Sequence, residues 1–259
     1  MGVTNTAVTW RPAGPERLPG EGLRERKKRL LRQQLSSTAT AMFMERGFEA
    51  VRVAEIADAC GVSEKTVFNY FPTKEALLLD RPDETATALR DALRVPETAP
   101  IEAALRVLDD ELDALTAWLG EQGDPARAAA TLQRFRDLSV STPSLRAHQY
   151  EMADKLATEV AGLLADRAGL DRDDPRPLIA AIALTGLWRV QAAALARFLT
   201  GRHTPAEVRE GVGAEVRRAA EIIQPTVRAL GDAGPESPRA ATTDPPGKPP
   251  ARRRRARPA

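Results

Sequence analysis

Apolar residues recur every three or four positions along nearly the whole chain between residues 23 and 229, which is the period of an α-helix. One clear row consists of Leu105, Leu108, Leu112, Leu115 and Leu119. The alternating pattern of a half-buried strand is not evident in this region. The repeated helical period therefore predicts an all-α fold.

Helix-ending and helix-starting residues divide this pattern into about nine helices. Gly47 ends the first helix and Gly61 the second, while Thr73 can cap a fourth that starts at Lys74. Further helices are predicted over residues 99–120, 125–140, 143–168, 175–200 and 205–229. Four of these open close to a proline, whose missing N–H does no harm there: Pro125, Pro143, Pro175 and Pro205.

The composition separates an ordered centre from two irregular ends. Residues 1–22 and 231–259 are rich in Gly, Pro or Arg and lack periodicity, so we expect both to be disordered. The prolines in residues 80–100 place a domain boundary there, between a small domain over residues 23–80 and a larger helical one over residues 81–230.

The chain has the features of a soluble protein. Its hydrophobic content of 42% can fill a core of this size. No window approaches eighteen uninterrupted apolar residues, and the N-terminus lacks the charged start and apolar block of a signal peptide. The single cysteine, Cys60, excludes an intramolecular disulfide. We therefore expect a cytoplasmic protein with no membrane segment.

The segment GVSEKTVFNYFPTKEAL, residues 61–77, predicts an unusually short helix with polar and aromatic side chains on its outer face. At 100° per residue, Val67 and Phe71 share one side, while Lys65 and Asn69 lie opposite. The preceding helix over residues 53–60 is joined to it by a three-residue turn, which is typical of a helix-turn-helix. One face of the short helix is thus anchored and the other is free.

The free face carries residue types that read DNA in the major groove. Lys65 can reach phosphate or guanine, Asn69 can pair with adenine, and Thr66 can bind phosphate or a thymine methyl. Phe68 can pack on a thymine methyl or a sugar, Tyr70 can donate to phosphate, and Lys74 suits a phosphate at the next helix start. Between Leu23 and Arg52, eight Lys or Arg stand against three Glu, a basic excess that fits the same partner.

Residues 26–79 resemble the DNA-binding domain of the tetracycline-repressor (TetR/AcrR) family. The resemblance lies in A-x-x-x-F-x-x-x-G-F-x-A from Ala39, in V-x-x-I-A from Val53, and in G-V-S-x-x-T-x-x-x-Y-F-x-x-K-x-x-L from Gly61. It implies a sequence-specific regulator of transcription, commonly a repressor, that binds double-stranded DNA at a palindromic operator. The DNA-contacting residues that it implies are Arg52, Ser63, Lys65, Thr66, Phe68, Asn69, Tyr70 and Lys74.

Two of these positions depart from the family pattern. Arg52 stands where the family often has a Thr that binds phosphate, so charge would replace that hydrogen bond. Phe68 stands where many members have Tyr, which leaves apolar contact only. Glu64 would repel phosphate, so we expect it to turn away from the backbone or to read cytosine.

The resemblance also implies a homodimer and a small-molecule effector. The dimer would form through the helices near residues 175–200 and 205–229, and the segment from Pro177 to Leu199 is apolar nearly all round, as a helix buried on every face would be. The aromatic or polar candidates for effector contact are Trp118, Phe135, His148, Tyr150 and Trp188. Low aromatic content favours an aliphatic pocket and a lipophilic effector, and we hypothesise that the effector shifts the helix at Lys74.

Two acidic strings leave an enzyme open as an alternative. Asp109, Asp110 and Asp113 satisfy the D-D-x-x-D motif of magnesium-dependent prenyl-diphosphate synthases, and Asp171, Asp173 and Asp174 satisfy the D-x-D-D motif of some terpene cyclases. A diphosphate site would need further acidic and basic partners on a facing helix. With two His and one Cys, the chain cannot build a three-ligand metal site of N/S type without carboxylates.

Of these alternatives we expect that the chain is not an enzyme and that it binds no cofactor or metal. A second alternative is an architectural DNA binder without an effector, helped by the Arg-rich tail at residues 252–257.

Overall fold

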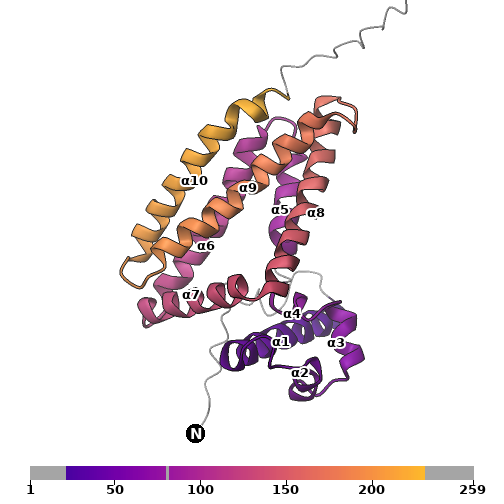
Figure 1. Cartoon of the computed structure of the whole chain (residues 1–259), viewed down its shortest axis with the longest axis vertical. Coiled ribbons are helices and arrows are strands. Elements are labelled where there is room, and N and C mark those ends of the chain that lie inside the picture. Colours follow the sequence, from indigo (N-terminus) through magenta and orange to yellow (C-terminus); the bar gives the residue numbers. More distant parts are fainter. Residues whose placement is uncertain (1–21, 80–81, 231–259) are drawn as a thin grey trace, which may run out of the picture.

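The computed structural model describes residues 22–79 and 82–230, which form ten helices and no strand (Figure 1). The helices are α1 (Leu23–Arg46), α2 (Val53–Ala59), α3 (Glu64–Tyr70), α4 (Ala76–Leu79), α5 (Pro82–Leu93), α6 (Pro100–Glu121), α7 (Pro125–Ser141), α8 (Pro143–Ala168), α9 (Pro175–Phe198) and α10 (Pro205–Arg228). The predicted all-α fold is confirmed for these residues.

Helices α1 to α4 enclose their own hydrophobic core at the lower end of the molecule (Figure 1). Its fully buried side chains include Leu35, Phe43, Ile56, Val67 and Leu77. The sharp turns between helices depend on glycine, since Gly47 and Gly61 have φ of 86° and 68°, a region that other residues rarely adopt. The small domain thus folds around one compact cluster.

The larger domain packs α6, α9 and α10 side by side, with α8 against α9 and α5 against α6 and α8 (Figure 1). A leucine and alanine core joins these helices. The guanidinium of Arg167, near the end of α8, donates to four carbonyls at and after the end of α5: Leu93 at 2.8 Å, Val95 at 3.0 Å, Pro96 at 2.8 Å and Thr98 at 2.6 Å. One side chain therefore binds the whole α5–α6 connection to α8.

Helix α7 connects the two domains. It runs across the lower end of the larger domain and contacts α1, α6 and α8 (Figure 1). Phe135 and Leu138 pack against the core of the small domain, and Leu145 at the start of α8 is completely buried in that core. The two domains are thus joined by apolar packing as well as by the chain.

The predicted helix bounds in the larger domain agree with the observed ones to within two residues, because proline opens each of these helices. About nine helices were expected; the described residues form ten, because α5 lies within residues 80–100, where the sequence analysis placed the domain boundary and no helix. Thr73 Oγ1 accepts from the N–H of Ala76 at 3.1 Å as a cap, but the α-helix begins at Ala76 and not at Lys74. The disorder expected of residues 1–22 and 231–259 falls, except for Gly22, outside the described residues.

Helix α9 has an apolar face that this chain alone does not cover. Leu178, Ile179 and Ile182 are 45%, 55% and 52% exposed, so α9 is not buried on every side within one chain. Among the described helices, α9 is also the one long and apolar enough to span a membrane, with a mean hydropathy of 1.6. Its packing against α8 and α10 instead makes it part of the helical bundle.

Candidate functional site

Helix α3 is held to the small domain by one side. Val67 is completely buried and Phe71 is 2% exposed. Arg32 of α1 donates to the carbonyl of Tyr70 at 2.8 Å, and its guanidinium lies 4.6 Å from the centre of the Phe71 ring. These contacts fix the end of α3, where carbonyls lack helical partners.

Ser63 sets the start of α3. Its Oγ accepts from the N–H of Thr66 at 3.1 Å and lies 2.9 Å from the Thr66 hydroxyl. The side chains of Ser63 and Thr66 therefore interact at the exposed N-terminal turn of α3, where free N–H groups favour an anion.

The opposite face of α3 points to solvent. Lys65 and Asn69 are exposed, Phe68 is 45% exposed, and Thr66 and Tyr70 are half-buried. The structure thus brings these five side chains together on one short helix.

Arg52, just before α2, is exposed for 86% of its side chain and approaches Glu55 only at 4.0 Å. Glu55 accepts from the Arg52 backbone N–H at 2.8 Å and from Arg46 at 2.7 Å. The hydrogen bond from the Arg52 backbone, followed by that from Arg46, lowers the pKa of Glu55. Glu55 thus remains a carboxylate that fixes the start of α2, while the Arg52 guanidinium reaches into solvent.

Lys74 lies against aromatic rings. Its Nζ is 4.4 Å from the centre of the Phe48 ring and 5.7 Å from that of Phe43. Such cation–π contacts at partly exposed sites contribute about 0.5–1 kcal/mol, so the ammonium could still turn to a phosphate at small cost.

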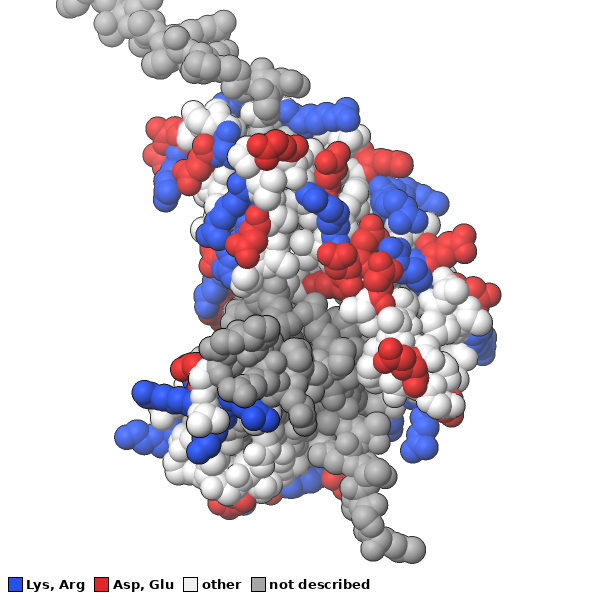
Figure 2. Space-filling view, turned by 180° about the vertical axis from the view of Figure 1, so that it is seen from behind, with Lys and Arg blue, Asp and Glu red and all other residues white. Residues whose placement is uncertain are grey.

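Lys and Arg outnumber Asp and Glu in the small domain. Figure 2 shows Lys and Arg side chains projecting from this domain, at the lower left, whereas both signs are mixed over the larger domain. A basic surface around an exposed helix is the arrangement that attracts the phosphates of a duplex.

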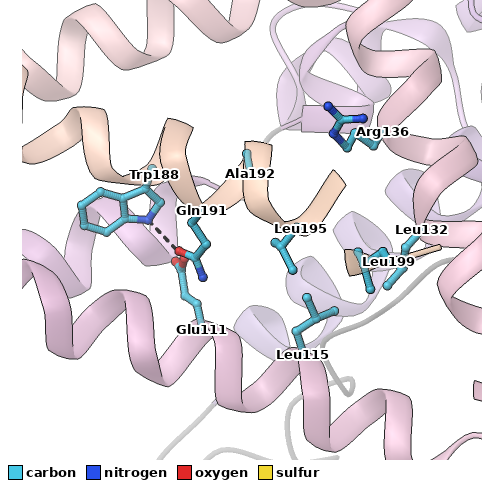
Figure 3. A pocket seen from close by; sticks show the side chains of 9 residues that line it. All are labelled: Glu111, Leu115, Leu132, Arg136, Trp188, Gln191, Ala192, Leu195 and Leu199. Carbon is cyan, nitrogen blue, oxygen red and sulfur yellow. Dashed lines mark hydrogen bonds between the residues drawn. The ribbon is translucent and has the colours of Figure 1, made fainter. Parts of the chain in front are cut away.

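The larger domain contains a cavity of about 250 Å³ between α6, α7 and α9 (Figure 3). Its lining consists of Glu111, Leu115, Leu132, Arg136, Trp188, Gln191, Ala192, Leu195 and Leu199. Glu111 accepts a hydrogen bond from Trp188 Nε1 at 3.1 Å and another from the Thr85 hydroxyl. The cavity is therefore mainly aliphatic, with three polar groups at defined places.

Comparison with known proteins identifies the family. Residues 35–80 match the model of bacterial regulatory proteins of the tetR family, and residues 102–220 match the MftR C-terminal domain. The HTH-type transcriptional regulator TcmR of Streptomyces glaucescens is 30% identical over 195 residues, which cover 70% of this chain and 81% of TcmR. The chain belongs to the tetR family. The resemblance predicted from residues 26–79 is confirmed, and the protein is a DNA-binding transcriptional regulator.

Solved structures of tetR-family proteins are also among those that this regulator matches. A TetR-family regulator of Streptomyces coelicolor is 21% identical, covers 82% of this chain and 98% of its own, and has a TM-score of 0.43. Thermus thermophilus FadR, solved in complex with lauroyl-CoA, is 24% identical, covers 80% of this chain and 97% of its own, and has a TM-score of 0.34.

Of the five aromatic or polar residues predicted for effector contact in this tetR-family protein, only Trp188 lines the cavity. Trp118 packs partly buried on the larger core, Phe135 packs on the small domain, and His148 is half-buried. Tyr150 is 57% exposed, with Arg189 5.5 Å from its ring centre.

Three polar lining residues were missed by the sequence analysis: Glu111, Arg136 and Gln191. The useful signal was Gln191, an amide within the mainly apolar sequence of α9.

The acidic strings have partners within this tetR-family chain. Asp109 and Asp113 of α6 form ion pairs with Arg209 of α10, and the hydrogen bond that Arg209 donates to Asp113 raises the pKa of Arg209. Asp174 caps α9 by accepting from the N–H of Arg176 at 2.9 Å. Within residues 22–79 and 82–230, no cluster of three His, Cys, Asp or Glu could hold a metal.

Proposed function

We propose that this tetR-family regulator is a cytoplasmic homodimeric repressor that binds a palindromic operator and releases it when a small, lipophilic effector enters the larger domain. The observation that carries the DNA-binding site is the exposed face of α3, opposite the buried Val67. Lys65 and Asn69 would read base edges, and Thr66, Tyr70 and Arg52 would contact the backbone. Lys74 would add a phosphate contact after leaving the Phe48 ring.

The exposed apolar face of α9 supports the dimer. Leu178, Ile179 and Ile182 lie uncovered on this helix, and Ile222 of α10 is 74% exposed. Gly186, one helical turn beyond Ile182, has open space within 4 Å of where a Cβ would stand. A second copy of the chain would cover these side chains by a twofold contact of the same surfaces.

A dimer also meets the requirement for selectivity. One α3 helix reads only a few base pairs, and two copies on half-sites about one helical turn apart (roughly 34–36 Å) multiply the discrimination. We therefore expect a palindromic operator.

Helix α7 offers a route by which the effector would change DNA affinity. Leu132 and Arg136 line the cavity, whereas Phe135 and Leu138 of the same helix pack on the core of the small domain. A ligand that moves α7 would therefore move the small domain, including α4, and change the spacing of the two α3 helices. Operator affinity would fall because the ligand-bound protein holds the two α3 helices at a spacing that does not match the two half-sites.

The test is selection of bound DNA from a random pool with the full-length protein, followed by binding measurements on the selected site. We expect a palindromic consensus and a loss of about 2–6 kcal/mol in binding free energy for the double variant Lys65→Ala, Asn69→Ala, since each base contact contributes about 1–3 kcal/mol. The control is Lys155→Ala, a solvent-exposed lysine of α8. A folded, dimeric double variant that keeps full selectivity would refute the assignment of α3.

A further inference from the structure

The amide of Gln191 is buried in the cavity wall with one atom unsatisfied. The residue is 5% exposed, yet its Oε1 accepts no hydrogen bond from the described part of the chain. Its Nε2 donates to the carbonyl of Leu108 at 3.2 Å. Because a carbonyl only accepts, this bond fixes the orientation of the amide and leaves Oε1 for another partner.

A second acceptor lies beside this amide. Figure 3 shows the side chains of Gln191 and Glu111 pointing toward one another from α9 and α6. The Glu111 carboxylate already accepts from Trp188 Nε1 and from the Thr85 hydroxyl. This corner of the cavity therefore presents acceptors, and a ligand group placed there must donate a hydrogen bond.

The rest of the cavity favours a small, uncharged and mainly apolar ligand. Its volume of about 250 Å³ lies below the usual range for drug-sized ligands. Leu115, Leu132 and Leu195 form apolar walls. Glu111 already accepts two hydrogen bonds and Arg136 lines the same cavity, so a cationic ligand would gain little there to offset its desolvation.

We infer that the cavity binds a neutral, largely apolar alcohol or phenol whose hydroxyl donates to Gln191 Oε1. The inference deepens the proposed function and rests on it for the role of the cavity as the effector site. The hydroxyl satisfies the buried oxygen, and the apolar body fills the space between the leucines.

Three probes of nearly equal shape test this choice on the full-length protein: 1-naphthol, naphthalene and 1-naphthylmethylammonium. Equilibrium dialysis in the absence of DNA gives their dissociation constants. The wild type should bind 1-naphthol about tenfold more tightly than naphthalene, because naphthalene leaves the buried Gln191 Oε1 without a hydrogen-bond donor and its affinity falls by about that factor. It should bind the ammonium compound most weakly.

The variant Gln191→Met keeps the length of the side chain and removes the acceptor. We expect its preference for 1-naphthol over naphthalene to fall to about one, with naphthalene binding retained as evidence of an intact cavity. The matched control, Gln149→Met, makes the same exchange at an exposed glutamine of α8 that does not line the cavity, and it should keep the wild-type preference.

Three results would overturn the inference: no preference for 1-naphthol in the wild type, the same preference in Gln191→Met, or tightest binding of the ammonium compound. Failure of all three probes to bind would overturn it as well. The proposed switch is judged separately, by operator affinity with and without 1-naphthol. A ligand that binds as expected but leaves operator affinity unchanged would refute the switch and not the ligand chemistry.

Discussion

Replacement of Ile182 by Asp should separate the proposed dimer into monomers. Ile182 is 52% exposed on α9, between Ile179 and Gly186 on the same face of the helix. In a twofold interface each substitution occurs twice, once in each subunit. A single change therefore acts on two buried contacts.

The magnitude follows from the exposed area. Full burial of an Ile side chain contributes about 1.5–3 kcal/mol, so covering the exposed half contributes about 1 kcal/mol. Loss of two such contributions removes about 2 kcal/mol and raises the dissociation constant of the dimer about thirtyfold. Two carboxylates brought into an apolar interface add a desolvation penalty, so this factor is a lower bound.

Sedimentation equilibrium over a range of protein concentrations measures this change. The matched control is Val140→Asp, which adds the same charge at a 45% exposed apolar residue near the end of α7. The control should dimerise as the wild type does, and circular dichroism should show both variants folded. An Ile182→Asp protein with the dissociation constant of the wild type would show that this face of α9 is not the interface.

Further predictions concern the fold and are checked by denaturant or acid unfolding. Arg167→Met should lower the free energy of unfolding by about 2–4 kcal/mol, because a charged donor to four carbonyls is lost. Gly211→Ala should destabilise by about 1–2 kcal/mol, because its Cβ would overlap the Phe198 ring. Gly162→Ala should instead stabilise by about 0.5–1 kcal/mol, because Gly162 lies inside α8 with open space around its Cβ position. Hydrogen bonds from Arg176 lower the pKa of Asp174 from 3.8 to about 2. The ionised Asp174 therefore stabilises the folded protein fully above pH 3.8, and this stabilisation is lost as the pH falls toward 2. Asp174→Asn should remove this dependence of the unfolding free energy on pH between 3.8 and 2.

Helix bounds were predictable because they depend on local chemistry. Pro125, Pro143, Pro175 and Pro205 each begin a helix, and Ser63 caps α3, as serine commonly does at a helix start. The outward face of α3 was predictable for the same reason, since Val67 and Phe71 fix its rotation by helical period alone.

Contacts between distant segments were not predictable in this way. The position of Lys74 over the Phe48 ring depends on how α1 and α4 cross, which no local pattern records. The cavity depends on which faces of α6, α7 and α9 turn toward one another, so conspicuous aromatic residues were poor guides. Phe135 illustrates this, because it packs on the small domain although its neighbours Leu132 and Arg136 line the cavity.

Helix α7 contacts the cavity with some side chains and the small domain with others, so it can transmit a movement between the two domains. Positions 132 and 136 are one helical turn apart, and positions 135 and 138 follow a second row, so a rigid helix presents one row to the cavity and the other to the small domain. A ligand that displaces Leu132 cannot leave Leu138 in place unless α7 bends, and no proline or glycine interrupts α7 after Pro125. Leu138→Ala should therefore weaken the effect of a ligand on operator affinity while leaving ligand binding itself unchanged. A variant that loses ligand binding instead would show that α7 does not separate the two roles.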